Sequence, residues 1–401
     1  MAAGQHRSTR SKWLIWGGRR LRARPVCFKV IDEAFDGGMT MESRFDYFLC
    51  RHGHKPVEIN IFQYTDPFDD VCLTYWVRVL RELEPLLNAK DLVFYIVWDS
   101  ETVRELPSYG KNVVVLLLME EFCDIPPYFD KVLYVFKTYG FYPYVNASQR
   151  KLSVALMVKA IRDAGRWVCR SGLQAVLHGS AIAREEGGMV VPLGYARQTD
   201  LPGKPFAERR YTISFIGSVK QRAYHPVSLR ALLGTPKDIA RSRMLDELRQ
   251  LAVGMPDEVF WADTGSYMDG ILSDGVRYSE LMADSKICLA PRGSSTETFR
   301  MFEGMRQGCV VICDRVPRHW FFEDCPFIQL DDWAELGPCV NALLSDPERL
   351  VELHRSTLDW WERRCSAPAL AGVMANRLSR ATQAGRVIED AGEASELELQ
   401  V

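Results

Sequence analysis

The sequence predicts an α/β protein with two halves, each built on a parallel sheet covered by helices on both faces. Short apolar runs alternate with helix-like segments in two blocks, one starting near residue 57 and the other at residue 211. A polar stretch with two prolines and a glycine separates them and has the composition of a linker. The 401 residues are enough for two domains with separate cores.

The N-terminal half is predicted to start with a strand over residues 57–64. Residues 72–87 place their apolar side chains at three-and-four spacing, which is typical of an amphipathic helix. Buried strands are expected at 91–99, 112–122 and 131–140. A helix over about 148–170 and a final apolar run at 187–195 complete this half.

The C-terminal half repeats the alternation. Strands are predicted at 211–218, 258–263, 286–291 and 309–314, with helices around 242–253 and 278–284 and from about 296. The predicted division is a basic, flexible tail at 1–25, an N-terminal domain at 26–195, a linker at 196–210, a C-terminal domain at 211–388 and an acidic tail at 389–401. Two such domains leave a cleft between them, where ligands bind beyond the carboxyl ends of the strands.

The composition restricts the classes of function. A net charge of −2 argues against a protein that coats nucleic acid, so no obligatory nucleic-acid partner is expected. No apolar run approaches the roughly 18 residues that span a bilayer. We therefore expect no transmembrane segment and a cytoplasmic protein, or one of the Golgi lumen if a membrane anchor has been removed. The eleven cysteines show no zinc spacing, so no metal site is predicted. The composition does not indicate an oligomeric state.

One loop carries the residue types of a phosphate site. The apolar run at 286–291 ends in small and basic residues, just before a predicted helix. Glycine and serine let backbone N–H groups approach an anion, the helix N-terminus adds partial positive charge, and arginine offers a planar donor fork that matches phosphate oxygens. The residues predicted to bind a diphosphate here are Arg292, Gly293, Ser294, Ser295, Thr298 and Arg300.

Glu303 lies one turn into the same helix, three residues after Arg300. A glutamate in this place can accept hydrogen bonds from vicinal hydroxyls such as those of a ribose. The same spacing also suits an ordinary i,i+3 ion pair at a helix start. The residues alone leave both interpretations open.

The strand at 211–218 ends in a similar way. Gly217 is followed by Lys220 and Arg222. A glycine after the first strand of a nucleotide-binding half commonly makes room for a diphosphate. The full glycine fingerprint is missing. This loop by itself therefore predicts a phosphate site only weakly, and the prediction becomes stronger when it is combined with the loop after residue 290.

The stretch from Tyr278 to Asp314, YSELMADSKICLAPRGSSTETFRMFEGMRQGCVVICD, resembles the core motif of the exostosin-like glycosyltransferases, glycosyltransferase family 47. The segments YTISFIGSVKQR (211–222) and PFIQLDDWAEL (326–336) are also similar to that family. The resemblance covers roughly residues 211–380, and the first half matches weakly if at all. Thr298 stands where the family often has serine, Gly304 where alanine is usual, and CVVICD replaces the usual apolar strand with its proline.

This resemblance implies two Rossmann-like domains facing across a cleft, the architecture called GT-B. It implies an inverting glycosyltransferase that moves a sugar from a UDP-sugar to a carbohydrate or other hydroxyl-bearing acceptor, with no cofactor and no essential metal. By resemblance, Arg300 and the 290s loop hold the diphosphate, and Glu303 holds the ribose. The alternatives are another nucleotide-sugar enzyme of this architecture, such as an epimerase, and a non-catalytic sugar- or nucleotide-binding protein.

An inverting transfer needs a base that accepts the proton of the acceptor hydroxyl. In this architecture the base projects from the N-terminal half into the cleft. Carboxylates at predicted strand ends are the candidates, namely Asp99, Glu120 and Glu121, with the latter two preferred because they follow the most apolar strand. For any single one of them, a helix-capping or solvated carboxylate is the favoured interpretation. Further candidates are Asp66, Asp69, His52, His54 and His178.

Overall fold

The computed structural model describes residues 14–16, 19–21, 42–64, 73–98, 103–144, 154–196, 198–219, 234–264 and 274–398. Residues 1–41 and residues 42–401 form two separate units. In the smaller unit, β1 (Leu14–Trp16) pairs with β2 (Arg19–Leu21) in an antiparallel ladder. The rest of the predicted basic tail, and the end of the acidic tail at 399–401, lie outside the described residues.

The N-terminal half is built on a six-stranded sheet of order β4-β3-β5-β6-β7-β8. All neighbours are parallel except β3 and β4. The strands are β3 (Asp46–Cys50), β4 (Val57–Glu58), β5 (Val93–Val97), β6 (Gly110–Leu117), β7 (Val132–Lys137) and β8 (Gly188–Val190). The predicted parallel sheet is confirmed.

The predicted strand at 57–64 is shorter in the structure. Only Val57 and Glu58 pair with β3, and the chain then turns so that Ile59 and Ile61 enter the core. β5 pairs in parallel with β6 on one side and, on the other, with β3, a strand that the sequence analysis did not identify. Two buried isoleucines at alternate positions look like a strand in the sequence, although here they belong to a turn.

The C-terminal half has a five-stranded, fully parallel sheet of order β10-β9-β11-β12-β13. Its strands are β9 (Tyr211–Gly217), β10 (Val259–Asp263), β11 (Ser285–Ala290), β12 (Val310–Asp314) and β13 (Ile328–Leu330). The first four agree with the predicted strands. The fold class, two α/β halves on parallel-dominated sheets, is therefore confirmed.

Helices connect and cover these strands. They are α1 (Leu73–Leu83), α3 (Val154–Ala183), α5 (Pro236–Gly254), α6 (Gly275–Ala283), α7 (Phe299–Arg306), α8 (Leu336–Leu344), α9 (Pro347–Arg364) and α10 (Ala367–Glu398). Short 3-10 turns lie at Glu84–Leu86, Phe206–Glu208, Trp320–Phe322 and Trp333–Glu335. Helix α5 begins earlier than the predicted 242, because Thr235 caps it by accepting a hydrogen bond from the backbone N–H of Asp238.

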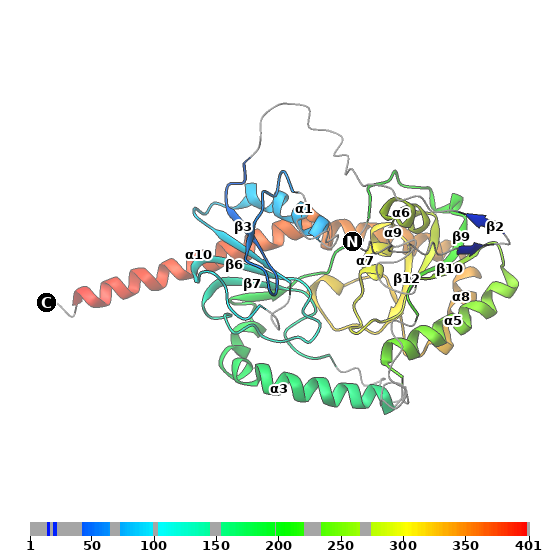
Figure 1. Cartoon of the computed structure of the whole chain (residues 1–401). Coiled ribbons are helices and arrows are strands. Elements are labelled where there is room, and N and C mark those ends of the chain that lie inside the picture. The colour runs from blue at the N-terminus through cyan, green and yellow to red at the C-terminus, as the bar shows by residue number, and fades with distance from the viewer. Residues whose placement is uncertain are drawn as a thin grey trace, which may run out of the picture. The chain divides into compact units, whose positions relative to one another are not determined.

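The last helix connects the two halves. Helix α10 follows the C-terminal sheet in the chain but packs against α1 and β7 of the N-terminal sheet (Figure 1). The hydroxyl of Tyr75 on α1 donates to the carbonyl of Cys365, just before α10, at 2.8 Å. One apolar cluster accordingly includes buried residues from both sheets. This shared core determines which strand ends meet at the site described next.

Candidate functional site

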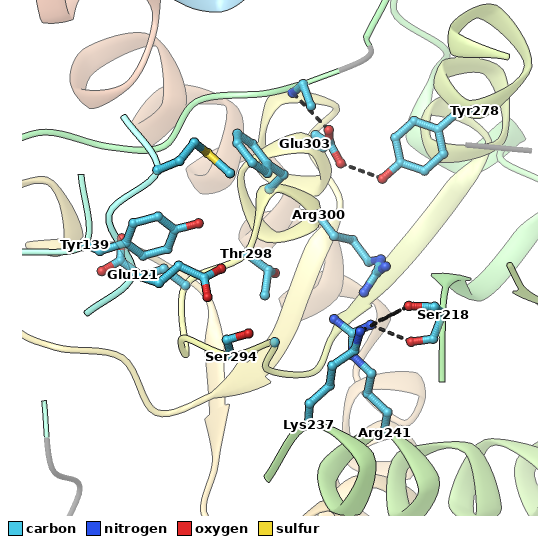
Figure 2. Close-up of a pocket in the computed structure, with 15 residues that line it drawn as sticks. Glu121, Tyr139, Ser218, Lys237, Arg241, Tyr278, Ser294, Thr298, Arg300 and Glu303 are labelled. Carbon is cyan, nitrogen blue, oxygen red and sulfur yellow. Dashed lines mark hydrogen bonds between the residues drawn. The ribbon is translucent and has the colours of Figure 1, made fainter. Parts of the chain in front are cut away.

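The loops after β6, β9 and β11, with the starts of α5 and α7, line a cavity of about 270 Å³. In Figure 2, Glu121 and Tyr139 of the N-terminal half lie across this cavity from Lys237, Arg241 and Arg300 of the C-terminal half. The carboxyl ends of the two sheets therefore meet at one cavity, which is where open parallel sheets bind ligands. We call it the large cavity.

Arg300 reaches from the first turn of α7 to the end of β9. Its guanidinium lies over the ring of Phe215, 4.7 Å from the ring centroid. A Cβ on Gly217 would lie 1.8 Å from Nη2 of Arg300, so only glycine leaves room for this side chain. Nε and Nη1 of Arg300 are buried and have no hydrogen-bond partner among the residues that the structure describes. Arg300 lines the cavity and, among the described residues, has two N–H groups without acceptors. A bound anion would supply hydrogen-bond acceptors for them.

Two further cations join Arg300, and the sequence analysis did not identify them. Lys237 and Arg241 lie in the first turns of α5 and also line the large cavity. Nζ of Lys237 donates to Oγ of Ser218 at 3.2 Å, and Nη1 of Arg241 donates to the carbonyl of Ser218. The sequence did not mark them as site residues, because the helix was predicted to begin after both of them.

Burial and mutual repulsion act on these cations. Burial, and then the neighbouring Arg241, lowers the pKa of Lys237 to about 8. Burial, and then Arg300, lowers the pKa of Arg241. Because Lys237 and Arg241 have lowered pKa values beside a third cation, Arg300, a bound polyanion stabilises their protonated forms. This end of the large cavity therefore suits a diphosphate.

Glu303 lines the same cavity on the next turn of α7. It is 4 % exposed, and its carboxylate accepts hydrogen bonds from the hydroxyl of Tyr278 at 2.6 Å and from the backbone N–H of Ala196 at 3.1 Å (Figure 2). Burial raises its pKa, and the hydrogen bond from Tyr278 opposes that change. The i,i+3 ion pair with Arg300, left open above, is not among the salt bridges of the described residues. The oriented carboxylate instead lines the cavity beside the cation cluster.

The remaining residues of the 290s loop separate into two groups. Gly293, Ser294 and Thr298 line the large cavity, and their phosphate-binding role stays a prediction. The side chain of Arg292 does not, since it lines a smaller adjoining cavity together with Ser295. Its backbone N–H donates to Asp314 at 2.7 Å, and its carbonyl accepts from Nε of Arg241 at 3.0 Å. Arg292 thus supports the loop through its backbone while its guanidinium points elsewhere.

The base candidates differ in their surroundings. Glu121 lines the large cavity. Its pKa is raised, because the effect of burial exceeds the opposing effect of a hydrogen bond with Ser294. Glu120 is 1 % exposed, accepts from the backbone N–H groups of Phe122 and Asp124, and pairs with buried Lys137 at 3.4 Å. Glu120 therefore holds the loop, and Glu121 is the carboxylate presented to the cavity.

Several predicted residues lie outside the described part of the chain. They are Asp66, Asp69, Asp99, Lys220 and Arg222. The candidates His52, His54 and His178 are described but line neither cavity. Within the described ranges, no group of three or more histidine, cysteine or acidic side chains is arranged to hold a metal ion. The helices of those ranges include none that is long and apolar enough to cross a membrane.

Comparisons with known proteins give limited matches. No protein-family profile matches the sequence. The chain is 36 % identical over 84 residues to the exostosin-1 homolog of Caenorhabditis elegans, a match that covers 20 % of this chain and about a fifth (21 %) of that protein. Among solved structures, the GtfA/B complex is similar with a TM-score of 0.39 and 11 % identity, over 77 % of this chain and 61 % of that one. A TarM mutant of S. aureus in complex with fondaparinux, α-GlcNAc-glycerol and UDP also has a TM-score of 0.39, with 12 % identity over 75 % of this chain and 58 % of that one.

Proposed function

We propose that this protein is a glycosyltransferase that binds a UDP-sugar in the large cavity and transfers its sugar, with inversion, to a hydroxyl group. The observation that carries the proposal is the cluster of Lys237, Arg241 and Arg300 at the end of β9, with the carboxylate of Glu303 in the same cavity. The exostosin-like motif and the 84-residue match to the exostosin-1 homolog support it.

The donor is proposed to bind with its diphosphate on the cation cluster. Two free donors of Arg300, the ammonium of Lys237 and the guanidinium of Arg241 offset the charge of the diphosphate and stabilise it as the leaving group, without a metal ion. Glu303 accepts hydrogen bonds from the ribose hydroxyls, because Tyr278 and Ala196 leave part of its acceptor capacity unused.

The transfer requires one proton acceptor. As the acceptor oxygen forms its bond to the anomeric carbon, the bond from that carbon to the diphosphate oxygen breaks and its electron pair goes to the diphosphate. The proton of the acceptor hydroxyl passes to the carboxylate of Glu121. A raised pKa strengthens Glu121 as a base at neutral pH, provided that it is ionised.

Calorimetric titration with UDP, GDP and ADP in the presence of EDTA tests the donor site. We expect selective UDP binding that weakens about tenfold to a hundredfold in Arg300→Gln, because two charge-assisted hydrogen bonds are lost. A further titration with 2′-deoxy-UDP tests Glu303: Glu303→Gln, which keeps the shape of the side chain, is expected to reduce the preference for UDP over this analogue.

A matched control is available on α5. Arg243 is exposed and pairs with Asp332 instead of lining the cavity. Arg243→Gln removes the same charge as Arg241→Gln and should leave the UDP affinity unchanged. Failure of all three nucleotides to bind would contradict the proposal, whereas UDP binding without turnover of any UDP-sugar would favour a non-catalytic binding protein. The anomeric configuration of the product, read by NMR, tests inversion.

A further inference from the structure

A second cavity, of about 60 Å³, adjoins the large one. We call it the small cavity. The two share four lining residues, namely Glu121, Tyr139, Ser294 and Glu297. A group bound in the small cavity therefore lies beside Glu121 and directly next to a donor in the large cavity.

Two residues that line the small cavity each have a buried polar atom without a partner in the described part of the chain. One is Nε of Arg292, whose side chain is 6 % exposed, and the other is Oε2 of Glu297, whose side chain is 3 % exposed. The other oxygen of Glu297 bonds Nε2 of His319 at 3.1 Å, which fixes the carboxylate. Leaving buried polar atoms unsatisfied is costly, so the site favours a ligand that supplies their partners.

The chemistry of these two atoms indicates the ligand. Nε of Arg292 can only donate, and the carboxylate of Glu297 accepts. A phosphate or carboxylate ligand can satisfy only the first, and an ammonium only the second. A hydroxyl group both donates and accepts, and a pair of neighbouring hydroxyls satisfies both atoms together.

The charges around the small cavity agree with a neutral ligand. Its cations are Lys159 and Arg292, and its carboxylates are Glu121, Asp163 and Glu297. Lys159 is already paired with Asp163, so no surplus of positive charge remains for an anion. Tyr139 and Tyr144 also line the small cavity, and aromatic faces pack well on the C–H surfaces of sugar rings.

We propose that the small cavity is the acceptor subsite and that it recognises a neutral sugar through two hydroxyl groups, one accepting from Arg292 and one donating to Glu297. This inference rests on the proposed function. It assigns Arg292 to the acceptor instead of the diphosphate, for which the sequence analysis predicted it. It also assigns a role to Glu297, which the sequence analysis did not identify.

Saturation-transfer NMR with the whole chain tests the subsite. The probes are methyl β-glucoside, methyl β-galactoside and methyl β-xyloside, compared with methyl β-glucuronide, each with and without UDP. The variants are Arg292→Lys, which keeps the charge but loses Nε, and Glu297→Gln. Arg318→Lys and Glu323→Gln, at exposed positions outside both cavities, are the controls. We expect at least one neutral glycoside to bind, and about tenfold weaker binding in each test variant but in neither control.

The same samples, titrated with UDP, separate this proposal from the proposed function. UDP affinity within twofold of wild type in Arg292→Lys, whose side chain does not line the large cavity, is the expected result. If Arg292→Lys lowers the UDP affinity as much as Arg300→Lys does, Arg292 binds the diphosphate and the proposal is overturned. Preference for the glucuronide, or no binding of any neutral glycoside, would overturn it as well. If UDP fails to bind but glycoside binding depends on Arg292 and Glu297, the proposed donor is wrong and the sugar subsite stands.

Discussion

Gly217 and Arg300 come from two separate motifs and meet in space, where a Cβ on Gly217 would lie 1.8 Å from Nη2 of Arg300. The glycine is the last residue of β9, and the arginine is the second residue of α7. The arginine can occupy the end of the strand only because the glycine has no side chain. The two loops that the sequence analysis predicted to bind phosphate are therefore parts of one site.

This contact predicts a non-additive pair of mutations. Gly217→Ala should displace the Arg300 guanidinium and weaken UDP binding about tenfold or more. In an Arg300→Ala background the clash is gone, so adding Gly217→Ala should cost less than it does in wild type, leaving only the strain of an alanine at a φ of +156°. Calorimetric titration of the four proteins with UDP measures the coupling. Independent, additive effects would show that the glycine does not act through Arg300.

The pKa of Lys237 predicts how UDP binding depends on pH. Burial lowers this pKa to about 8, and only the protonated amine attracts the diphosphate. Affinity should therefore be full at a pH well below 8 and fall as the pH rises through that value, by about tenfold at pH 9.5. Lys237→Met should bind more weakly and lose this pH dependence, and Lys237→Arg should keep affinity at high pH. An unchanged pH curve in Lys237→Met would assign the titration to another group.

Glu121 is expected to act in turnover and not in nucleotide binding. Glu121→Gln should lower the rate of UDP release from a UDP-sugar by about 100-fold or more, because it removes the base. The UDP affinity should change by less than about threefold. In wild type, the rate should fall as the pH decreases through the pKa of Glu121, which burial raises above the ordinary glutamate range. A full rate in Glu121→Gln would exclude it as the base.

The neighbouring Glu120 should affect stability instead. Glu120→Gln leaves the fully buried ammonium of Lys137 without its carboxylate, which typically costs about 3–5 kcal/mol of unfolding free energy. Urea denaturation of Glu120→Gln and Glu121→Gln compares the two positions directly. Glu121→Gln should be neutral or stabilising, because burial disfavours the charge that it removes. Equal losses of stability would contradict this division of roles.

Much of this protein follows from local sequence pattern. The alternation of apolar runs and helical spacing predicted both parallel sheets, because buried parallel strands are apolar on both faces. Small residues beside cations at strand ends also identified the loops with Gly217, Gly293 and Ser294, which the structure places at the large cavity and beside Arg300, while phosphate binding there stays a prediction. Glu121 was among the base candidates because it follows the most apolar strand.

Tertiary packing decided what the local pattern left open. Lys237 and Arg241 become site residues only because α5 begins at Pro236 and lies beside the end of β9. Arg292 sits in the same loop as Ser294, yet its side chain turns into the small cavity. Helix α10 crosses from the C-terminal sheet to pack on α1 and β7. A sequence pattern reports which neighbours a residue has along a strand or helix, whereas the direction of a long side chain and the partner of a helix depend on surfaces that meet only when the whole chain has folded.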